Sequence, residues 1–199
     1  SGIGVNALGY GYKKYTDRLS EQLGKLLHVS NYFYSEPLLS AAKRYTEASG
    51  MDKVFFTNSG AEAVEGALKL ARKYAHEEKN DECNEIIAFN HSFHGRSIGA
   101  VSVTGTDSYR SPYGPLLTDV KFADYNDIES VRALVSDKTC AIILETIQGE
   151  GGIHVADKEF LSEIRNICDK NNIVMILDEV QCGMGRSGKM FAYQNYDIV

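Results

Sequence analysis

The amino-acid sequence predicts an α/β fold, in which a mainly parallel sheet carries helices on both faces. Short apolar runs alternate with segments of helical periodicity over most of the chain. The runs are largely continuous in apolar residues, which is typical of parallel strands covered on both sides. No repeat, low-complexity tract or linker rich in Pro, Gly or Ser interrupts this order. The length therefore suits one large domain with a sizeable core.

Two helices are expected within the first 50 residues. One face of the first helix would carry four leucines, which are Leu19, Leu23, Leu26 and Leu27. Pro37 would open the second helix and Gly50 would end it, because proline suits a first helical turn and glycine suits the position after the last.

Strands and helices are then expected in turn. The strands are predicted at residues 54–57, 85–89, 120–123, 140–145 and 173–177. One helix would run from Ala61 to Ala75, and another would begin at Asn126, where Glu129 has capping-box spacing. A third helix is indicated by the apolar face of Phe160, Ile164, Ile167 and Cys168. Residues 97–104 fit either a helix or a strand.

Charge and composition exclude several classes of protein. The 21 Lys and Arg against 27 Asp and Glu leave a net charge of −6. This balance counts against a broad surface for nucleic acid or for an anionic membrane. The longest apolar runs have five residues, too few to span a bilayer. The four cysteines form no C-x-x-C pair, so we expect reduced thiols in a cytoplasmic protein rather than disulfides or a zinc site.

Polar residues at the strand ends are the candidate ligands, because parallel sheets bind ligands at the carboxyl ends of their strands. Ser59, Gly60 and Ala61 would lead into a helix, and their small size lets an anion reach the free N–H groups there. This pattern predicts a phosphate site. The same pattern also fits a well-capped helix, with Asn58 or Ser59 as the cap.

A second candidate is the loop after residues 85–89. Phe93 could stack on a flat ring, and Arg96 could hold a carboxylate with its forked donors. The alternative is a surface loop with a fixed arginine. His91 and His94 lie in the same loop, but no further cluster of His or Cys completes a metal site, so no metal is expected.

Three carboxylates follow the last two predicted strands. Glu145 and Glu150 flank a Gly-rich turn, where they could do acid/base or ion-pair work or could simply be solvated. Asp178 directly follows an apolar strand, which is costly unless the carboxylate meets a cation or hydrogen-bond donor. A protonated ring nitrogen of a cofactor would be such a partner. The alternative is a buried aspartate that caps a neighbouring loop.

Two nucleotide-binding patterns overlap near the end of the chain. Residues 183–189 fit G-x-x-x-x-G-K, but Met190 stands where a P-loop needs Ser or Thr. The same stretch fits G-x-G-x-x-G, with too little chain after it for a βαβ unit. A nucleotide hydrolase is therefore kept only as a remote alternative.

Taken together, the motifs resemble those of the fold-type I, class III aminotransferases, and within that family the acetylornithine aminotransferases most. The likeness covers the whole chain, in order and at family-like spacing, through residues 1–10, 58–63, 93–96, 148–152 and 177–188. Thr146 departs from the proline that is frequent in the family, and Tyr10 departs from its frequent histidine.

The resemblance implies pyridoxal 5'-phosphate (PLP) as cofactor. Gly60 and Ala61 would give N–H groups to its phosphate, and Asp178 would pair with its ring nitrogen. The implied cofactor-binding residues are Ser59, Gly60, Ala61, Phe93, Asp178, Val180 and Gln181. Of these, Phe93 and Val180 would cover the two ring faces, and Gln181 would bond near the ring hydroxyl.

The resemblance also implies the substrate contacts. Arg96 would bind the α-carboxylate of the amino acid, and Glu150 would be a gate residue that pairs with a later arginine. The Schiff-base lysine would lie beyond Val199, so no catalytic residue is expected within the chain. Residues 1–199 would then be the central part of the cofactor domain, without the N-terminal segment, the lysine strand and the small C-terminal domain. Such a fragment is expected to be inactive alone.

The implied function of the intact enzyme is transfer of the terminal amino group of N-acetylornithine to 2-oxoglutarate. This is a step of arginine biosynthesis, expected in a cytoplasmic homodimer. The alternatives are another class III aminotransferase, acting on ornithine, succinylornithine or 4-aminobutyrate, or a non-catalytic domain that keeps the fold without the lysine.

Overall fold

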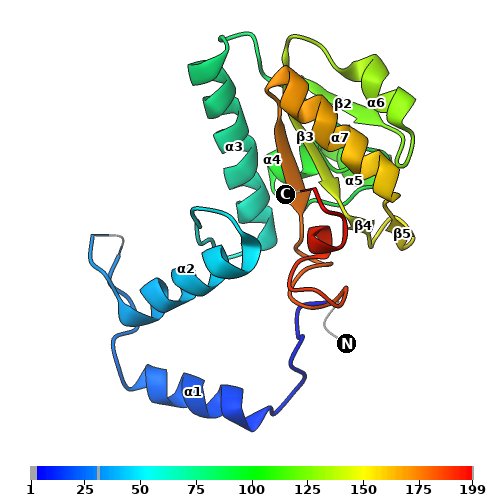
Figure 1. Cartoon of the computed structure of the whole chain (residues 1–199). Coiled ribbons are helices and arrows are strands. Elements are labelled where there is room, and N and C mark those ends of the chain that lie inside the picture. The colour runs from blue at the N-terminus through cyan, green and yellow to red at the C-terminus, as the bar shows by residue number, and fades with distance from the viewer. Residues whose placement is uncertain (1–3, 31, 199) are drawn as a thin grey trace. The chain divides into compact units, whose positions relative to one another are not determined.

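The computed structural model of the chain describes residues 4–30 and 32–198 (Figure 1). The family-like segment at residues 1–10 is therefore described only from Gly4 onward, and Val199 also lies outside the described residues. The chain divides into two compact units, Ser1–Phe55 and Phe56–Val199, at a point where composition shows no boundary. Each unit is described by itself below.

The first unit contains α1 (Lys13–Leu23) and α2 (Glu36–Ser49). Pro37 lies in the first turn of α2, and Gly50 follows its last residue with a φ of 71°, which confirms the predicted start and end. The prediction for α1 was wrong at its end, because Gly24 follows its last residue and Leu26 and Leu27 lie beyond it. Glycine costs about 1 kcal/mol within a helix, which favours an end at this point.

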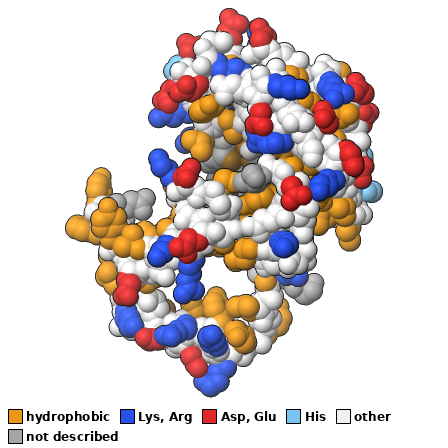
Figure 2. Space-filling view, in the orientation of Figure 1, with side chains coloured by type: hydrophobic (Ala, Val, Ile, Leu, Met, Phe, Trp, Pro, Cys, Tyr) orange, Lys and Arg blue, Asp and Glu red, His pale blue; other side chains and the backbone are white. Residues whose placement is uncertain are grey.

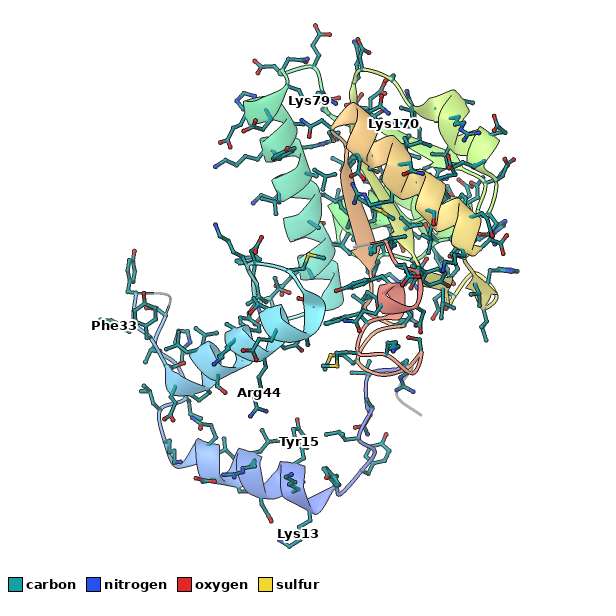
Figure 3. All side chains as sticks on the ribbon, viewed as in Figure 1. Lys13, Tyr15, Phe33, Arg44, Lys79 and Lys170 are labelled. Carbon is teal, nitrogen blue, oxygen red and sulfur yellow. The ribbon has the colours of Figure 1, made fainter. Side chains whose placement is uncertain are left out.

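Neither helix of the first unit buries a residue. Between them, Tyr32 and Tyr34 are 92% and 86% exposed. Figure 2 shows apolar side chains gathered over this unit, and Phe33 extends outward from it in Figure 3. A helix pair in which no described residue is fully buried gains little hydrophobic stabilisation of its own.

The second unit is built on a four-stranded sheet. Its order is β2 (Val120–Ala123), β1 (Glu85–Phe89), β3 (Thr139–Glu145) and β6 (Val174–Asp178). All three ladders are parallel, which confirms the prediction. A small antiparallel pair, β4 (Ile147–Gln148) and β5 (His154–Val155), lies outside this sheet.

Helices cover both faces of the sheet, as predicted (Figure 1). On one face, Ile86 and Ala88 of β1 pack with α3 (Gly60–Glu78) and α4 (Ile98–Ser102). The alternate residues of β1 face the other side, where α6 (Ile128–Leu134) and α7 (Lys158–Asn171) complete the core. Lys79 follows α3 and donates to the carbonyls of Thr139 and Asn171 (Figure 3).

Three short helical turns complete the described elements. They are α5 (Asp107–Arg110), the 3-10 turn Ser111–Tyr113 and the 3-10 turn Ala192–Asn195. Residues 97–104, which fitted helix or strand, contain α4. Residues 183–189 form turns with no helix directly after them, which is not the strand–loop–helix arrangement of a P-loop.

Two other local predictions were wrong. Residues 54–57 form no strand. The two edge strands of the described sheet, β2 and β6, each pair with one neighbour only, β1 and β3, so no further strand joins the sheet at either edge. Asn126 does not begin α6. It has a φ of 62° and its side chain bonds Val155 and Asp157, while Asp127 caps the helix by accepting from the backbone of Glu129.

No helix of the described residues is both long and apolar enough to cross a membrane. The four cysteines are buried and form no disulfide. On the face shown in Figure 2, basic and acidic side chains are interspersed rather than gathered into a patch of one sign.

Candidate active site

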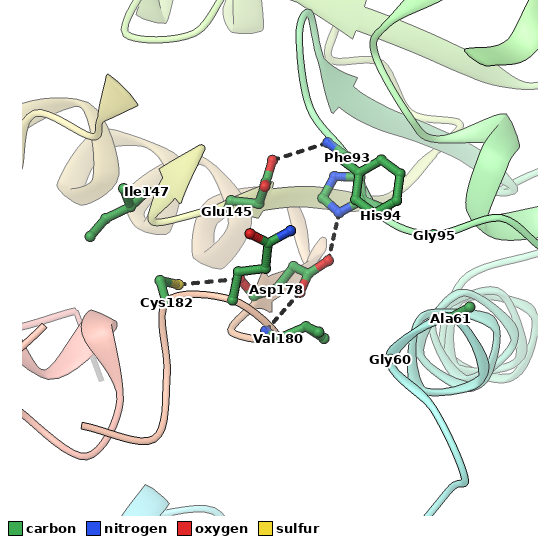
Figure 4. A pocket seen from close by; sticks show the side chains of 11 residues that line it. Gly60, Ala61, Phe93, His94, Gly95, Glu145, Ile147, Asp178, Val180 and Cys182 are labelled. Carbon is green, nitrogen blue, oxygen red and sulfur yellow. Dashed lines mark hydrogen bonds and ion pairs between the residues drawn. The ribbon is translucent and has the colours of Figure 1, made fainter. Parts of the chain in front are cut away.

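A pocket lies in the second unit, where the carboxyl ends of β3 and β6 meet the start of α3 and the loop after β1 (Figure 4). The residues that line it are Gly60, Ala61, Phe93, His94, Gly95, Glu145, Ile147, Asp178, Val180, Gln181 and Cys182. Six of the seven predicted cofactor-binding residues therefore line this pocket, and the seventh, Ser59, directly precedes Gly60 in the chain. Two predicted substrate residues, Arg96 and Glu150, are not part of the lining and are exposed.

The start of α3 is both capped and open to an anion. The Ser59 hydroxyl accepts from the Glu62 N–H at 3.2 Å, so the capping interpretation is correct. The N–H groups of Gly60 and Ala61 belong to the first turn and have no acceptor within the helix. A Cβ on Gly60 would lie 2.8 Å from Cγ1 of Val180, so only glycine lets the backbone at the start of α3 lie this close to the Val180 side chain.

Asp178 is the last residue of β6 and has a partner that the sequence argument missed. Its Oδ2 lies 2.8 Å from Nδ1 of His94, and its Oδ1 accepts from the Val180 N–H at 3.0 Å. The side chains of His94 and Asp178 are only 0% and 6% exposed. No basic residue is adjacent to Asp178 in the sequence, but the fold supplies His94 from the loop after β1. The presence of His94 in that loop was the one sign in the sequence of a basic partner for Asp178.

The tautomer of His94 follows from its surroundings. Nε2 is buried and has no hydrogen-bond partner within the described part of the chain. A buried N–H without a partner is costly, so the proton belongs on Nδ1, where it is donated to the Asp178 carboxylate. Asp178 is therefore fixed by one side-chain donor and one backbone donor.

Glu145 is a second buried carboxyl group beside this pair. It is the register partner of Asp178 across β3 and β6, and it accepts from the Phe93 N–H at 3.3 Å. Burial raises the pKa of Glu145 to about 7; the neighbouring His94 opposes this rise and the Asp178 charge adds to it. Of the two carboxylates that flank the Gly-rich turn, Glu145 is therefore buried at the pocket, whereas Glu150 lies exposed in the turn after β4.

The loop between β1 and α4 is packed tightly onto the start of α3. Gly95 has a φ of 130°, and a Cβ there would lie 2.9 Å from the Cβ of Ala61. On one side of this glycine, Phe93 lines the pocket. On the other, the Arg96 guanidinium lies over the Tyr109 ring at 4.4 Å and the Phe93 ring at 5.2 Å. Tyr109 had no signal in the sequence.

Comparisons with known proteins identify the family of the chain. The family described as Aminotransferase class-III matches residues 1–199. The chain is 46% identical over 198 residues to an acetylornithine aminotransferase of Methanocaldococcus jannaschii, covering 100% of this chain and 50% of that protein. It is 47% identical over 199 residues to an acetylornithine aminotransferase of Clostridium acetobutylicum, covering 100% of this chain and 51% of that protein.

A solved structure is similar at the level of the fold and the sequence. It is the ornithine aminotransferase of Toxoplasma gondii crystallised with oxidised glutathione, which is described as having partial occupancy of PLP at its active site. The TM-score is 0.92 at 30% identity, over 98% of this chain and 47% of that chain. The chain thus spans about half the length of the relatives it matches.

Proposed function

The chain belongs to the class III aminotransferases, and on that basis we propose that the protein containing it is a PLP-dependent transaminase. We further propose that it moves the terminal amino group of N-acetylornithine to 2-oxoglutarate. The single observation that carries the proposal is the pocket itself. It joins the open start of a helix, an aromatic side chain and a buried, histidine-supported carboxylate.

The residues present fit the cofactor. The N–H groups of Gly60 and Ala61 suit a phosphate, because the start of α3 carries partial positive charge. Phe93 and Val180 offer apolar surface to a flat ring. Asp178 offers a buried carboxylate whose known partners are both donors, so it suits a protonated ring nitrogen.

PLP, when bound, supplies an electron sink for the carbanion of the amino-acid substrate. In our proposal Asp178 keeps the ring nitrogen protonated, and His94 holds the carboxylate in place for that task. Gln181 hydrogen-bonds near the ring hydroxyl. Gly149 makes room for this side chain, since a Cβ on it would lie 2.9 Å from the Gln181 Oε1.

Substrate recognition is proposed at the rim of the pocket. Arg96 binds the α-carboxylate of the amino acid, and Glu150 gates the site by pairing with an arginine outside these residues. None of the described lysines lines the pocket, and we propose that the Schiff-base lysine lies beyond Val199. Residues 1–199 would then be the central part of the cofactor domain, and the fragment alone would be inactive.

The choice of N-acetylornithine is supported by the names of the two curated relatives at 46% and 47% identity. We propose with it a role in arginine biosynthesis in a cytoplasmic homodimer. A second candidate is ornithine, because the solved relative described above is an ornithine aminotransferase. Succinylornithine and 4-aminobutyrate remain further candidates within the family.

The test uses the full-length protein. We expect added PLP to produce a saturable change in visible absorbance, and Asp178→Asn to weaken it. Glutamate formation from 2-oxoglutarate is then measured with N-acetylornithine, ornithine, succinylornithine and 4-aminobutyrate. N-acetylornithine should give the highest kcat/KM. Highest activity with another donor would overturn the substrate assignment, and PLP binding without turnover of any donor would favour the non-catalytic alternative.

A further inference from the structure

Arg96 differs from most arginines of the chain in what its guanidinium contacts. Side chains such as Arg18, Arg132 and Arg165 each form an ion pair with a nearby carboxylate. For Arg96, residues 4–30 and 32–198 provide no carboxylate or carbonyl within bonding distance of the guanidinium. Its contacts are two aromatic rings instead.

The two rings form a brace for the guanidinium. The Arg96 Cζ lies 4.4 Å from the centroid of Tyr109 and 5.2 Å from that of Phe93. The rings themselves meet edge to face, with centroids 6.1 Å apart and planes at 84°. A guanidinium that lies over ring faces spends no N–H donor on a carboxylate or a carbonyl, so its donors stay available for a bound carboxylate.

The backbone at Arg96 is held on both sides. Before it, Gly95 is packed against the Cβ atoms of Ala61 and Ala100, with no room for a Cβ of its own. After it, the Glu65 carboxylate accepts from the N–H groups of Gly99 and Ala100 at 2.8 and 3.2 Å. The direction of the guanidinium therefore depends mainly on the side-chain torsions of Arg96.

Tyr109 comes from a different element than the loop that it supports. It lies on α5 and is half-buried, while Arg96 and Phe93 lie in the loop between β1 and α4. We propose that Tyr109 is a positioning residue, which holds the Arg96 guanidinium against Phe93 so that its N–H donors are presented to the substrate carboxylate. This proposal rests on the proposed function of Arg96.

The expected effect concerns binding rather than turnover. A guanidinium that is already held in place loses less side-chain entropy when a carboxylate binds. Tyr109 does not itself line the pocket, and the lining residue that its ring meets is Phe93, not Asp178 or His94, which hold the cofactor ring nitrogen. The value of kcat should therefore change less than KM. The ring provides the contact, so Tyr109→Phe should behave like the wild type, whereas Tyr109→Leu should not.

The experiment uses the full-length holoenzyme with Tyr109→Leu, Tyr109→Phe and Tyr113→Leu. Tyr113 is an exposed aromatic of the adjacent turn and serves as the matched control. We expect Tyr109→Leu to raise the KM for N-acetylornithine about fivefold, from the loss of a partly exposed cation–π contact, with kcat within about twofold. N-acetylputrescine, which is the same donor without its carboxylate, should show no such change.

A measurement without turnover separates this inference from the proposed function. Calorimetry with glutarate, a dicarboxylate without a keto group, should show about fivefold weaker binding to Tyr109→Leu and unchanged binding to Tyr109→Phe. If Arg96→Ala weakens glutarate binding but Tyr109→Leu does not, the brace is wrong and the carboxylate site stands. If Arg96→Ala also leaves binding unchanged, the proposed role of Arg96 fails. Equal losses in Tyr109→Leu and Tyr113→Leu would likewise overturn the brace.

Discussion

Nδ1 of His94 lies 2.8 Å from Oδ2 of Asp178, although the two residues are 84 positions apart in the sequence. Both side chains are buried, so this pair is shielded from solvent at the end of β6. A carboxylate at the end of an apolar strand needs such a partner, because an uncompensated buried charge is costly. The pair therefore stabilises the buried charge of Asp178 at the pocket and joins the loop after β1 to the end of β6.

His94→Ala should lower the free energy of unfolding by about 3 kcal/mol, since it leaves the Asp178 charge without its side-chain partner. The matched control is His76→Ala. His76 lies at the same 2.8 Å from Asp81, but those side chains are 64% and 86% exposed. An exposed pair contributes at most about 1 kcal/mol. Urea denaturation measures both variants, and equal losses would contradict the importance of the buried pair.

Glu145 should make stability depend on pH. Its pKa is raised to about 7 by burial, so the folded protein holds this proton more tightly than the unfolded chain. Its contribution is full below the unfolded pKa of about 4.5 and is lost as the pH rises through about 7. Glu145→Gln should remove that loss, which is on the order of 3 kcal/mol.

The measurement for Glu145 is urea denaturation of wild type and Glu145→Gln at about pH 5 and about pH 8. The variant should gain stability relative to the wild type on going to the higher pH. A constant difference between the two proteins would show that Glu145 titrates as in an unfolded chain.

Gly60→Ala should weaken PLP binding about tenfold, because the added Cβ would lie 2.8 Å from Val180 Cγ1 at the start of α3, where we propose that the phosphate binds. Overpacking of this kind costs about 1–3 kcal/mol, and tenfold corresponds to about 1.4 kcal/mol. Gly24→Ala is the control, since its nearest contact would be 3.6 Å away. Absorbance titration of the full-length apoenzyme with PLP gives the dissociation constants. A Gly60→Ala value equal to that of the wild type would rule out this steric argument.

Glu65→Ala should lower stability by about 1–3 kcal/mol, because it leaves the N–H groups of Gly99 and Ala100 without their acceptor. Glu65→Gln should lose less, since its amide oxygen can still accept. Glu47, an exposed member of a pair with Lys43, provides the control variant Glu47→Ala. Thermal unfolding compares the three proteins, and a Glu65→Ala variant as stable as Glu47→Ala would contradict the role of Glu65.

The local pattern of the sequence determined much of the second unit. Apolar runs identified all four strands of the parallel sheet, because strands covered on both faces are largely apolar. The run of β2 is interrupted by Lys121. Ligands bind at the carboxyl ends of parallel strands, so the same runs also directed attention to Phe93 and Asp178. The apolar pattern failed where strand formation depends on pairing with a neighbouring strand. Residues 54–57 are apolar enough for a strand but have no ladder in the described sheet.

Only the tertiary structure decided which of these residues meet. His94 reaches Asp178 because β1 and β6 both flank β3. Glu145 acquires its raised pKa because the fold buries it, and the charge of Asp178, its register partner, adds to the rise. Tyr109 reaches Arg96 because α5 packs back onto the loop after β1. Side-chain type and period are properties of a local segment, and the sequence alone determined them. Contacts between distant segments depend on strand order and register, which no local period encodes.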